Sequence, residues 1–354
     1  MTERRASDEP FWWYHDTSSL RARLLIAGLT PVSALYGALA AHRMAAPPKH
    51  VSILPVICVG NFTAGGTGKT PLVREIVTRL RARGHTPVVL TRGYGGSTEG
   101  PHLVNCDHDT AASVGDEPCL IARDCAVVVS RDRAAGARFI EAHPSLRADV
   151  IVMDDGLQNP DLEKSLTIAV LDRRRAVGNG RTIPAGPLRA PLPAQLRHVS
   201  LLACVNPPDA SGTSAANPVT SAYSGPRLDV SVAPSGDTTW LRDAKVLAFA
   251  GIGAPERFFT MLEKLGATIV ARRAYPDHYA FEDRDADHLL REAARLDAIL
   301  VTTEKDQVRL RGTAAALDAL ASNVRVVPIR ATLDAKSSEV LDAALERITA
   351  RRSA

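Results

Sequence analysis

The chain has 354 residues, of which 45% are hydrophobic and 23% charged, so it can bury a substantial core and has the length for two domains. The formal net charge of +4 is mildly basic, and no Lys/Arg run alternates with aromatic residues, so nucleic acid is not an expected partner. The five cysteines are irregularly spaced and form no C-x-x-C pair, which argues against a disulfide framework or a zinc site.

The first organised segment begins with an aromatic cluster. Residues 1–10 are polar, do not resemble a secretory signal and are expected to be disordered. The cluster Phe11–Tyr14 precedes an uncharged, largely apolar run from Leu24 to Ala41, which has basic residues on both sides. Aromatic rings and cationic side chains with this placement are typical of the headgroup level of a membrane.

The apolar run is a poor candidate for a simple membrane span. A spanning helix needs about 20 apolar residues, and here Thr30, Pro31 and Ser33 interrupt the middle. Residues 1–50 are therefore predicted to hold a tail and a membrane-associated helix that lies on or dips into the bilayer. A helix packed on the main domain and a true span remain open as alternatives.

From Ser52 onward, short β-branched runs alternate with helical segments, which predicts parallel βαβ units. We assign residues 51–206 to this first α/β domain. Its helices are expected at 69–83 and 131–143. Its strands are expected at Ser52–Gly60, Thr86–Thr91, Ala126–Ser130, Val150–Asp154, Leu166–Leu171 and Val199–Val205.

The rest of the chain predicts a loop, a linker and a second α/β domain. Residues 173–197 are rich in Pro, Gly and Arg without periodicity, and a loop of this length is often functional. Residues 207–227 have the composition of a linker. Residues 228–354 are predicted as a smaller domain with strands at 245–250, 268–270, 298–303 and 324–329 and helices at 255–265, 284–296 and 337–351.

A glycine-rich turn follows the first strand. The general P-loop pattern is G-x-x-x-x-G-K-[ST], and this chain departs from it only by Thr63 at the first glycine. Backbone N–H groups of such a turn bind phosphate oxygens at a helix N-terminus, the lysine reaches the β- and γ-phosphates and the last hydroxyl ligates Mg²⁺. The predicted phosphate-binding residues are Thr63, Ala64, Gly65, Gly66, Thr67, Gly68, Lys69 and Thr70, with Thr70 also a metal ligand.

A second strand ends in two carboxylates. Asp154 and Asp155 come directly after the apolar run at 150–153, and Gln158 follows them. A P-loop enzyme needs acids at a neighbouring strand end to hold its metal or the water bound to it. A solvated turn would explain either acid alone, but the P-loop upstream favours a magnesium site for the pair.

Other polar groups have more than one interpretation. Gly115-Asp116-Glu117-Pro118 opens a helix with two acids, which is consistent either with simple capping or with a catalytic base. His278 follows Asp277 in the second domain, where a lone histidine is more often structural. Five arginines in or near loops suit phosphate binding or plain solvation; they are Arg92, Arg131, Arg133, Arg181 and Arg189.

Taken together, these motifs resemble the tetraacyldisaccharide 4'-kinase family, which phosphorylates a lipid A precursor in Gram-negative bacteria. The resemblance runs from the N-terminal segment to Thr303-Glu304-Lys305-Asp306. Its pieces occur in order: Val59-Gly60-Asn61, Ala64 to Pro71, Arg92-Gly93-Tyr94-Gly95-Gly96, Gly115 to Pro118, Asp154 to Gln158, Pro184 to Arg189, Ala250 to Gly253, and Asp277-His278.

The resemblance implies a P-loop NTPase-like, mostly parallel sheet with helices on both faces, and a kinase that uses ATP and Mg²⁺. The γ-phosphate would go to the 4'-hydroxyl of tetraacyldisaccharide 1-phosphate, giving lipid IVA. Asp116 would be the general base, assisted by His278, and Lys69 would also be catalytic. Asp154, Asp155 and Gln158 would serve the metal, and the substrate-binding residues would be Asn61, Arg92, Arg133 and Arg189.

The implied substrate also gives the N-terminal helix a role. A lipid with four acyl chains leaves a bilayer at a cost of roughly 0.8 kcal/mol for each exposed CH₂, so the enzyme must come to the membrane. We expect it at the cytoplasmic face of the bacterial inner membrane, peripheral or monotopic, with the lipid and that leaflet as partners and no protein partner.

Two positions depart from the family pattern, because Asn159 stands where His is common and Ala190 where Glu is common. Two rival functions also remain. One is a membrane-associated P-loop ATPase that hydrolyses ATP to drive a conformational cycle, which would have no need of a sugar-hydroxyl base. The other is a nucleotide-binding regulator without turnover.

Overall fold

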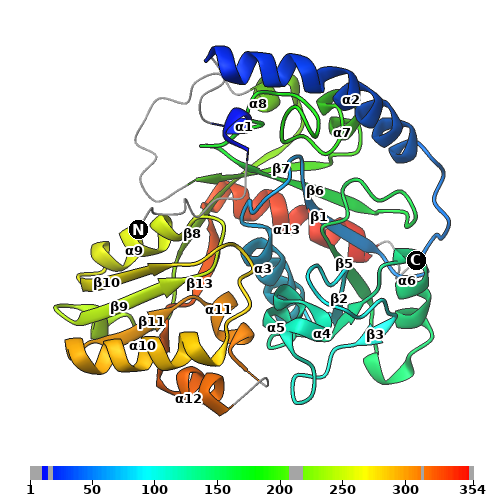
Figure 1. Cartoon of the computed structure of the whole chain (residues 1–354). Coiled ribbons are helices and arrows are strands. Elements are labelled where there is room, and N and C mark those ends of the chain that lie inside the picture. The colour runs from blue at the N-terminus through cyan, green and yellow to red at the C-terminus, as the bar shows by residue number, and fades with distance from the viewer. Residues whose placement is uncertain (1–9, 15–18, 207–217, 312–314, 351–354) are drawn as a thin grey trace.

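The structure is a computed structural model that describes residues 10–14, 19–206, 218–311 and 315–350 (Figure 1). The described strands form a nine-stranded sheet of order β13-β8-β7-β6-β1-β5-β2-β4-β3 and a four-stranded sheet of order β10-β9-β11-β12. The mostly parallel sheet and the smaller second α/β layer that the sequence predicts are confirmed by this architecture.

The centre of the large sheet is parallel and fully buried. β1 (Val56–Asn61) lies between β5 (Val150–Asp154) and β6 (Leu166–Asp172), with Val59 opposite Asp154. Such strands are continuous apolar runs because both faces of a parallel sheet are covered. The other strands are β2 (Pro87–Thr91), β3 (His102–Leu103), β4 (Val127–Val129), β7 (Leu201–Asn206), β8 (Arg227–Pro234) and β13 (Ile329–Leu333).

Helices cover both faces of the large sheet. On one face, α3 (Lys69–Ala82) and α13 (Ala335–Ala350) bury residues such as Ile76 and Leu345. On the other, α6 (Arg133–Glu141) buries Ile140 against the sheet. The shorter helices of this part are α4 (Ala111–Val114), α5 (Asp116–Ile121), η1 (Pro144–Leu146), α7 (Leu192–Leu196) and α8 (Pro218–Ala222).

The four-stranded sheet is a smaller parallel layer with its own core, which includes Phe249 and Leu289. Its strands are β9 (Lys245–Ala250), β10 (Thr268–Ala274), β11 (Ile299–Thr302) and β12 (Arg325–Val326). Its helices are η2 (Thr239–Leu241), α9 (Pro255–Lys264), α10 (Asp283–Leu296), α11 (Glu304–Arg309) and α12 (Ala315–Asn323).

The expected division at residue 228 does not follow the sheets. β8 pairs with β7 and with β13, and its inward residues Leu228 and Val230 belong to the large core. The chain leaves the large sheet after Pro234 and returns at Ile329, which is the register partner of Pro234. We call residues 235–328 the second unit and the rest the large unit. Of the expected linker, residues 207–217 lie outside the described residues, and 218–222 form α8.

The N-terminal apolar run forms α2 (Leu20–Met44), which runs along the outside of the large unit, with the short α1 (Phe11–Tyr14) beside it (Figure 1). The residues that α2 buries against the protein form one stripe, namely Ala22, Ile26, Ser33, Gly37 and Met44. The Ser33 hydroxyl donates to the carbonyl of Thr182 at 2.6 Å. By length and composition α2 is the one described helix that is apolar enough to cross a membrane.

Candidate active site

The glycine-rich turn stands between β1 and α3, where the sequence predicts it. Gly65 and Gly68 have φ values of 94° and 82°, which favour glycine, and α3 begins at Lys69. The Asn61 side chain donates to the carbonyl of Thr63 at 2.8 Å and so braces the turn from inside. The hydroxyl of Thr67 is buried without a hydrogen-bond partner among the described residues. The turn thus presents backbone N–H groups at a helix N-terminus, as phosphate binding requires.

Lys69 lies over the ends of both central strands. Its side chain is only 9% exposed, and its Nζ is 3.2 Å from Asn61 Oδ1 and 3.4 Å from Asp155 Oδ1. The absence of a side chain at Gly60 lets β1 lie close to the turn after β5, because a Cβ at Gly60 would stand 2.6 Å from the Cβ of Leu157. The P-loop and the carboxylate turn therefore meet on the same edge of the sheet, as expected.

The two neighbouring carboxylates differ in their surroundings. Burial alone would raise the pKa of Asp155, but Lys69 and Arg189 hold that pKa well below its usual range. Both Asp155 oxygens accept hydrogen bonds of 2.8 Å from Arg189 Nη1. Burial and the charge of Glu117 raise the pKa of Asp154, whose two oxygens accept no hydrogen bond from the described residues.

The structure brings Asp116 and His278 together across 162 positions of sequence. Asp116 is the first residue of α5, and His278 lies in the loop after β10 with its Nδ1 3.2 Å from Asp116 Oδ2. Tyr94 packs edge-on against His278, with ring centroids 5.3 Å apart. The hydrogen bond with Asp116 raises the pKa of His278. The pair lies near the P-loop, because the next residue, Glu117, accepts a hydrogen bond from Thr70 at 3.1 Å.

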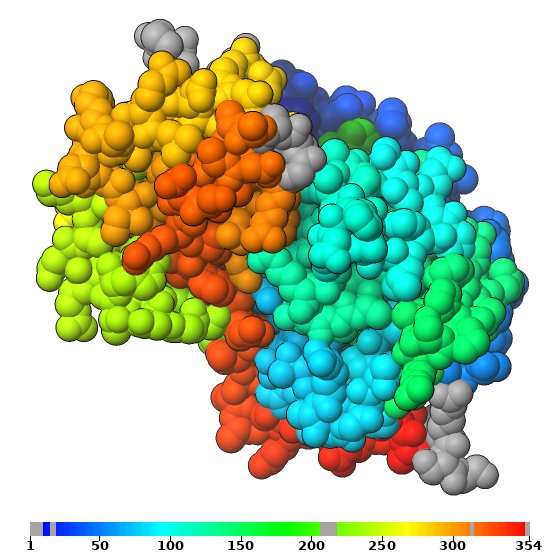
Figure 2. Space-filling model, turned by 90° about the horizontal axis from the view of Figure 1, so that it is seen from below, coloured from blue at the N-terminus to red at the C-terminus, as the bar shows by residue number. Residues whose placement is uncertain are grey.

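Two cations of α11 were not predicted from the sequence. Lys305 Nζ is 2.6 Å from Glu117 Oε1, and Arg309 donates through Nε to Asp116 Oδ2 at 3.1 Å and also through Nη2. Figure 2 shows the orange segment that includes α11 packed beside the cyan segment that includes α5. The motif containing Lys305 was recognised in the sequence, but ion pairs between segments about 190 positions apart leave no local pattern.

Four residues that were predicted to bind substrate or metal form hydrogen bonds to other residues of the site. Arg133 is buried and donates to the carbonyls of Ser130 and Asp154 at 2.6 and 3.3 Å. The Gln158 amide donates at 2.7 Å both to the carbonyl of Asn61 and to Gln195 Oε1. The four residues are Asn61, Arg133, Gln158 and Arg189. In contrast, Arg92 is exposed, with no hydrogen bond or ion pair to the described residues.

The two residues that depart from the family pattern, Asn159 and Ala190, both accept local hydrogen bonds. Asn159 Oδ1 accepts a hydrogen bond of 2.9 Å from the N–H of Asp161. Ala190 is fully buried, and its carbonyl accepts from Gln195 at 2.6 Å. Neither residue adds a carboxylate or imidazole beside Asp155. Among the described residues no three His, Cys, Asp or Glu side chains cluster as a metal site.

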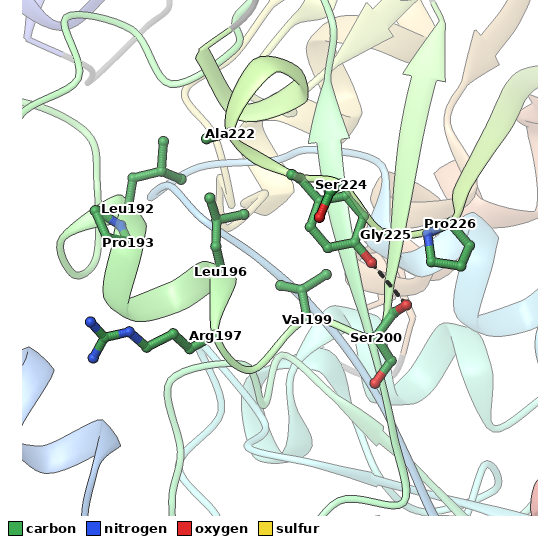
Figure 3. A pocket seen from close by; sticks show the side chains of 11 residues that line it. Leu192, Pro193, Leu196, Arg197, Val199, Ser200, Ala222, Ser224, Gly225 and Pro226 are labelled. Atoms are coloured by element: carbon green, nitrogen blue, oxygen red, sulfur yellow. Dashed lines mark hydrogen bonds between the residues drawn. The ribbon is translucent and has the colours of Figure 1, made fainter.

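A separate groove of about 550 Å³ lies between α7 and α8 (Figure 3). It is lined mostly by apolar side chains, such as Leu196 and Val199, and Tyr223 at its wall donates to the carbonyl of Ser200 at 2.8 Å. Ser200 precedes β7 and pairs with Thr167 near the start of β6, whereas the P-loop follows the far end of β1. The groove is therefore distinct from the site around Lys69.

Known proteins resemble this chain over most of its length. The family described as Tetraacyldisaccharide-1-P 4'-kinase matches residues 25–346. A tetraacyldisaccharide 4'-kinase of Rhodopseudomonas palustris is 48% identical over 306 residues, covering 85% of this chain and 86% of the relative. One from a Methylobacterium species is 45% identical over 345 residues, covering 97% and 98%. The crystal structure of LpxK from Aquifex aeolicus in complex with ATP matches with a TM-score of 0.72 and 25% identity, covering 92% of this chain and 99% of that one.

Proposed function

Because the chain belongs to the tetraacyldisaccharide-1-P 4'-kinase family, we propose that it transfers the γ-phosphate of ATP to the 4'-hydroxyl of tetraacyldisaccharide 1-phosphate, giving lipid IVA. The observation that supports this most directly is the Asp116–His278 pair, which stands beside a P-loop with a buried lysine. A hydrolase that only cycles between conformations has no use for a base directed at a sugar hydroxyl.

The P-loop amides and Lys69 would bind the phosphates of ATP. Lys69 is nearly buried, and among the described residues its Nζ pairs only with oxygen atoms of Asn61 and Asp155. A cation held in this way neutralises charge on the β- and γ-phosphates without having to reorganise during transfer. Thr63 to Thr70 form the phosphate cradle of the proposed ATP site, and Asn61 keeps the turn in shape.

The acids of this edge fit a magnesium ion. Asp154 carries two buried oxygens that accept no hydrogen bond from the described part of the chain, and a bound cation would compensate that burial. Mg²⁺ typically binds one or two carboxylates together with phosphate oxygens and water. Thr70 and Asp154 would hold it, and when bound it neutralises charge on the phosphate oxygens. Asp155 and Gln158 would support it indirectly, since Lys69, Arg189, Asn61 and Gln195 already engage their side chains.

Asp116 would accept the proton of the 4'-hydroxyl, with His278 holding its carboxylate. An aspartate of low pKa is a weak base, but the hydroxyl proton leaves late in a loose phosphoryl-transfer transition state, so position matters more than basicity. Arg92, which is exposed and unpaired among the described residues, would meet phosphate from solvent. Arg133 and Arg189 would contribute indirectly, because Arg133 donates to the backbone carbonyl of Asp154 and Arg189 pairs with the carboxylate of Asp155.

The geometry of α2 favours a helix that lies along the membrane rather than across it. One stripe of α2 packs on the large unit, while Leu24, Leu35 and Leu39 project outward. A span would have to break the hydrogen bonds between Ser33 and Thr182. We therefore place the enzyme as a peripheral or monotopic protein on the cytoplasmic face of the bacterial inner membrane, where it meets its lipid substrate.

The deciding experiment is an assay with labelled ATP and acylated disaccharide 1-phosphate in detergent. Wild type should label the lipid, and Asp116→Ala should lower kcat by about 10²–10⁴-fold, which is the usual contribution of a positioned base. Asp107→Ala, which removes an exposed acid from a nearby turn, is the matched control and should keep full activity. Label released only as inorganic phosphate would support the rival ATPase and overturn the kinase assignment.

A further inference from the structure

We infer that Arg309, on α11 of the second unit, is a positioning residue that holds Asp116 so that one chosen carboxylate oxygen faces the acceptor hydroxyl. This inference rests on the proposed phosphoryl transfer and adds a component to it. Arg309 touches neither the P-loop nor Lys69 in the described contacts, so any effect on catalysis must pass through Asp116 and its neighbours.

The donors around Asp116 are distributed unequally between its two oxygens. Oδ2 receives Arg309 through Nε at 3.1 Å and through Nη2, and it also lies 3.2 Å from His278 Nδ1. Among the residues that the structure describes, the only donor to Oδ1 is the backbone N–H of Glu117, at 2.9 Å. A carboxylate oxygen has two lone pairs, so Oδ1 keeps one for a substrate hydroxyl while Oδ2 is saturated.

Arg309 is itself fixed from the side away from Asp116. Its side chain is 7% exposed, and Nη1 donates to the carbonyl of Gly251 at 2.5 Å and to Asp306 Oδ1 at 2.8 Å. Asp306 in turn accepts from the hydroxyl of Thr303 at 2.6 Å and from the N–H of Gly251 at 3.1 Å. The planar guanidinium therefore cannot rotate without breaking bonds on both sides, and it transfers that rigidity to Asp116.

A purely structural role would be the attachment of the second unit to the large unit. The chain offers a matched comparison for that role in Arg257, whose Nη2 lies 2.9 Å from Asp172 Oδ2. Asp172, like Asp116, is a buried acid of the large unit that pairs with an arginine of the second unit. Within the described part of the chain this pair makes no hydrogen bond or ion pair with α5, so it attaches the two units without touching the catalytic acid.

The test compares Arg309→Gln, Arg309→Lys and Arg257→Gln in the same transfer assay, with a thermal unfolding curve for each. Arg309→Gln should lower kcat by about 10²-fold, the usual cost of misplacing a reacting group by about 1 Å, and leave KM for ATP unchanged. Arg309→Lys keeps one donor and should recover part of the loss. Arg257→Gln should keep wild-type kcat.

Two further measurements separate positioning from folding defects. In an Asp116→Asn background, Arg309→Gln should cost nothing more, because residues that act as a unit are not additive. Millimolar guanidinium should restore part of kcat to Arg309→Ala but none to Asp116→Ala. Equal losses in Arg309→Gln and Arg257→Gln, or full additivity with Asp116→Asn, would overturn the inference. Absence of labelled lipid from wild type would instead overturn the proposed function.

Discussion

Asp116 is a buried carboxylate that stays charged because its neighbours are cationic. Burial alone would raise its pKa, but the hydrogen bond from His278 and the charges of Lys305 and Arg309 hold that pKa well below its ordinary value. All three cationic groups belong to the second unit, whereas the acid belongs to the large unit. The ionised state of the proposed base therefore depends on contact between the two units.

His278 should make folding stability depend on pH. Its pKa is raised, first by the hydrogen bond with Asp116, so it is protonated more readily in the folded state. A group of this kind adds stability below its unfolded pKa of about 6.5 and loses it as pH rises through the folded value. His278→Asn should therefore lower the free energy of unfolding more at pH 6 than at pH 9. The ring is 34% exposed, so we expect a difference of about 1 kcal/mol or less.

Urea unfolding at the two pH values measures this difference. The exposed His108 provides the control, because His108→Asn removes an imidazole that makes no side-chain hydrogen bond or ion pair among the described residues. An equal destabilisation by His278→Asn at pH 6 and pH 9 would show that the imidazole contributes packing alone.

For single residues of the site, the sequence indicated which side chains carry the chemistry but not which other side chains they contact. The P-loop pattern placed Lys69 at the start of a helix, where α3 begins, and the family resemblance suggested Asp116 with His278. The different surroundings of Asp154 and Asp155 could not be predicted, since they depend on Glu117 and Arg189 in distant segments. The role of Arg309 could not be predicted for the same reason, because its ion pair with Asp116 joins two helices, α11 and α5, that are far apart in the sequence.

At the scale of elements, α2 should determine membrane binding. Leu24 and Leu35 are 65% and 64% exposed, and burying one such side chain in lipid contributes roughly 1.5–3 kcal/mol. Leu24→Lys/Leu35→Lys should therefore weaken binding to phospholipid vesicles by about 100-fold or more in a sedimentation assay. Transfer to detergent-dispersed lipid should be affected far less.

A control for this prediction is Val270→Lys, which adds a charge at an exposed position of β10 in the second unit. It should leave vesicle binding as in wild type. If the double leucine variant sediments with vesicles as well as Val270→Lys does, α2 does not contact lipid, and the outward face of the helix has another purpose.

Most elements could be predicted because their periodicity is strong. The buried strands β1, β5 and β6 are uninterrupted apolar runs, and α3 and α10 lie within a residue or two of the predicted helices. β8 was missed because its alternating pattern follows a segment rich in Pro, Ser and Gly. β13 was missed because the strand expected at 324–329 ended at the first residue of β13, Ile329.

At the scale of the whole molecule, the second unit is an insertion between two paired strands. Pro234 and Ile329 are opposite each other in the β8–β13 ladder. Replacing residues 235–328 by an Asn-Gly turn should therefore leave a folded large unit that still binds an ATP analogue, since insertions at such positions are removable. It should transfer no phosphate to lipid, because His278 and Arg309 are gone.

Circular dichroism with a thermal scan and analogue binding would test the shortened chain. A cooperative transition with retained binding is the expected result. Loss of both would mean that the large sheet needs the second unit to fold, and the ion pair of Arg74 with Glu304, at 3.0 Å, would be the first contact to examine. Retained lipid phosphorylation would contradict the role given to His278.

The β8–β13 ladder also governs how the two halves of the protein can shift. Because both tethers of the second unit lie in one hydrogen-bonded ribbon, sliding along the sheet would break several backbone bonds, whereas bending beyond the ribbon's end would leave the ladder intact. His278, Lys305 and Arg309 all lie between the two tethers and all contact the acids of α5. Separation of the two units would therefore remove the cationic partners of Asp116 and Glu117 together.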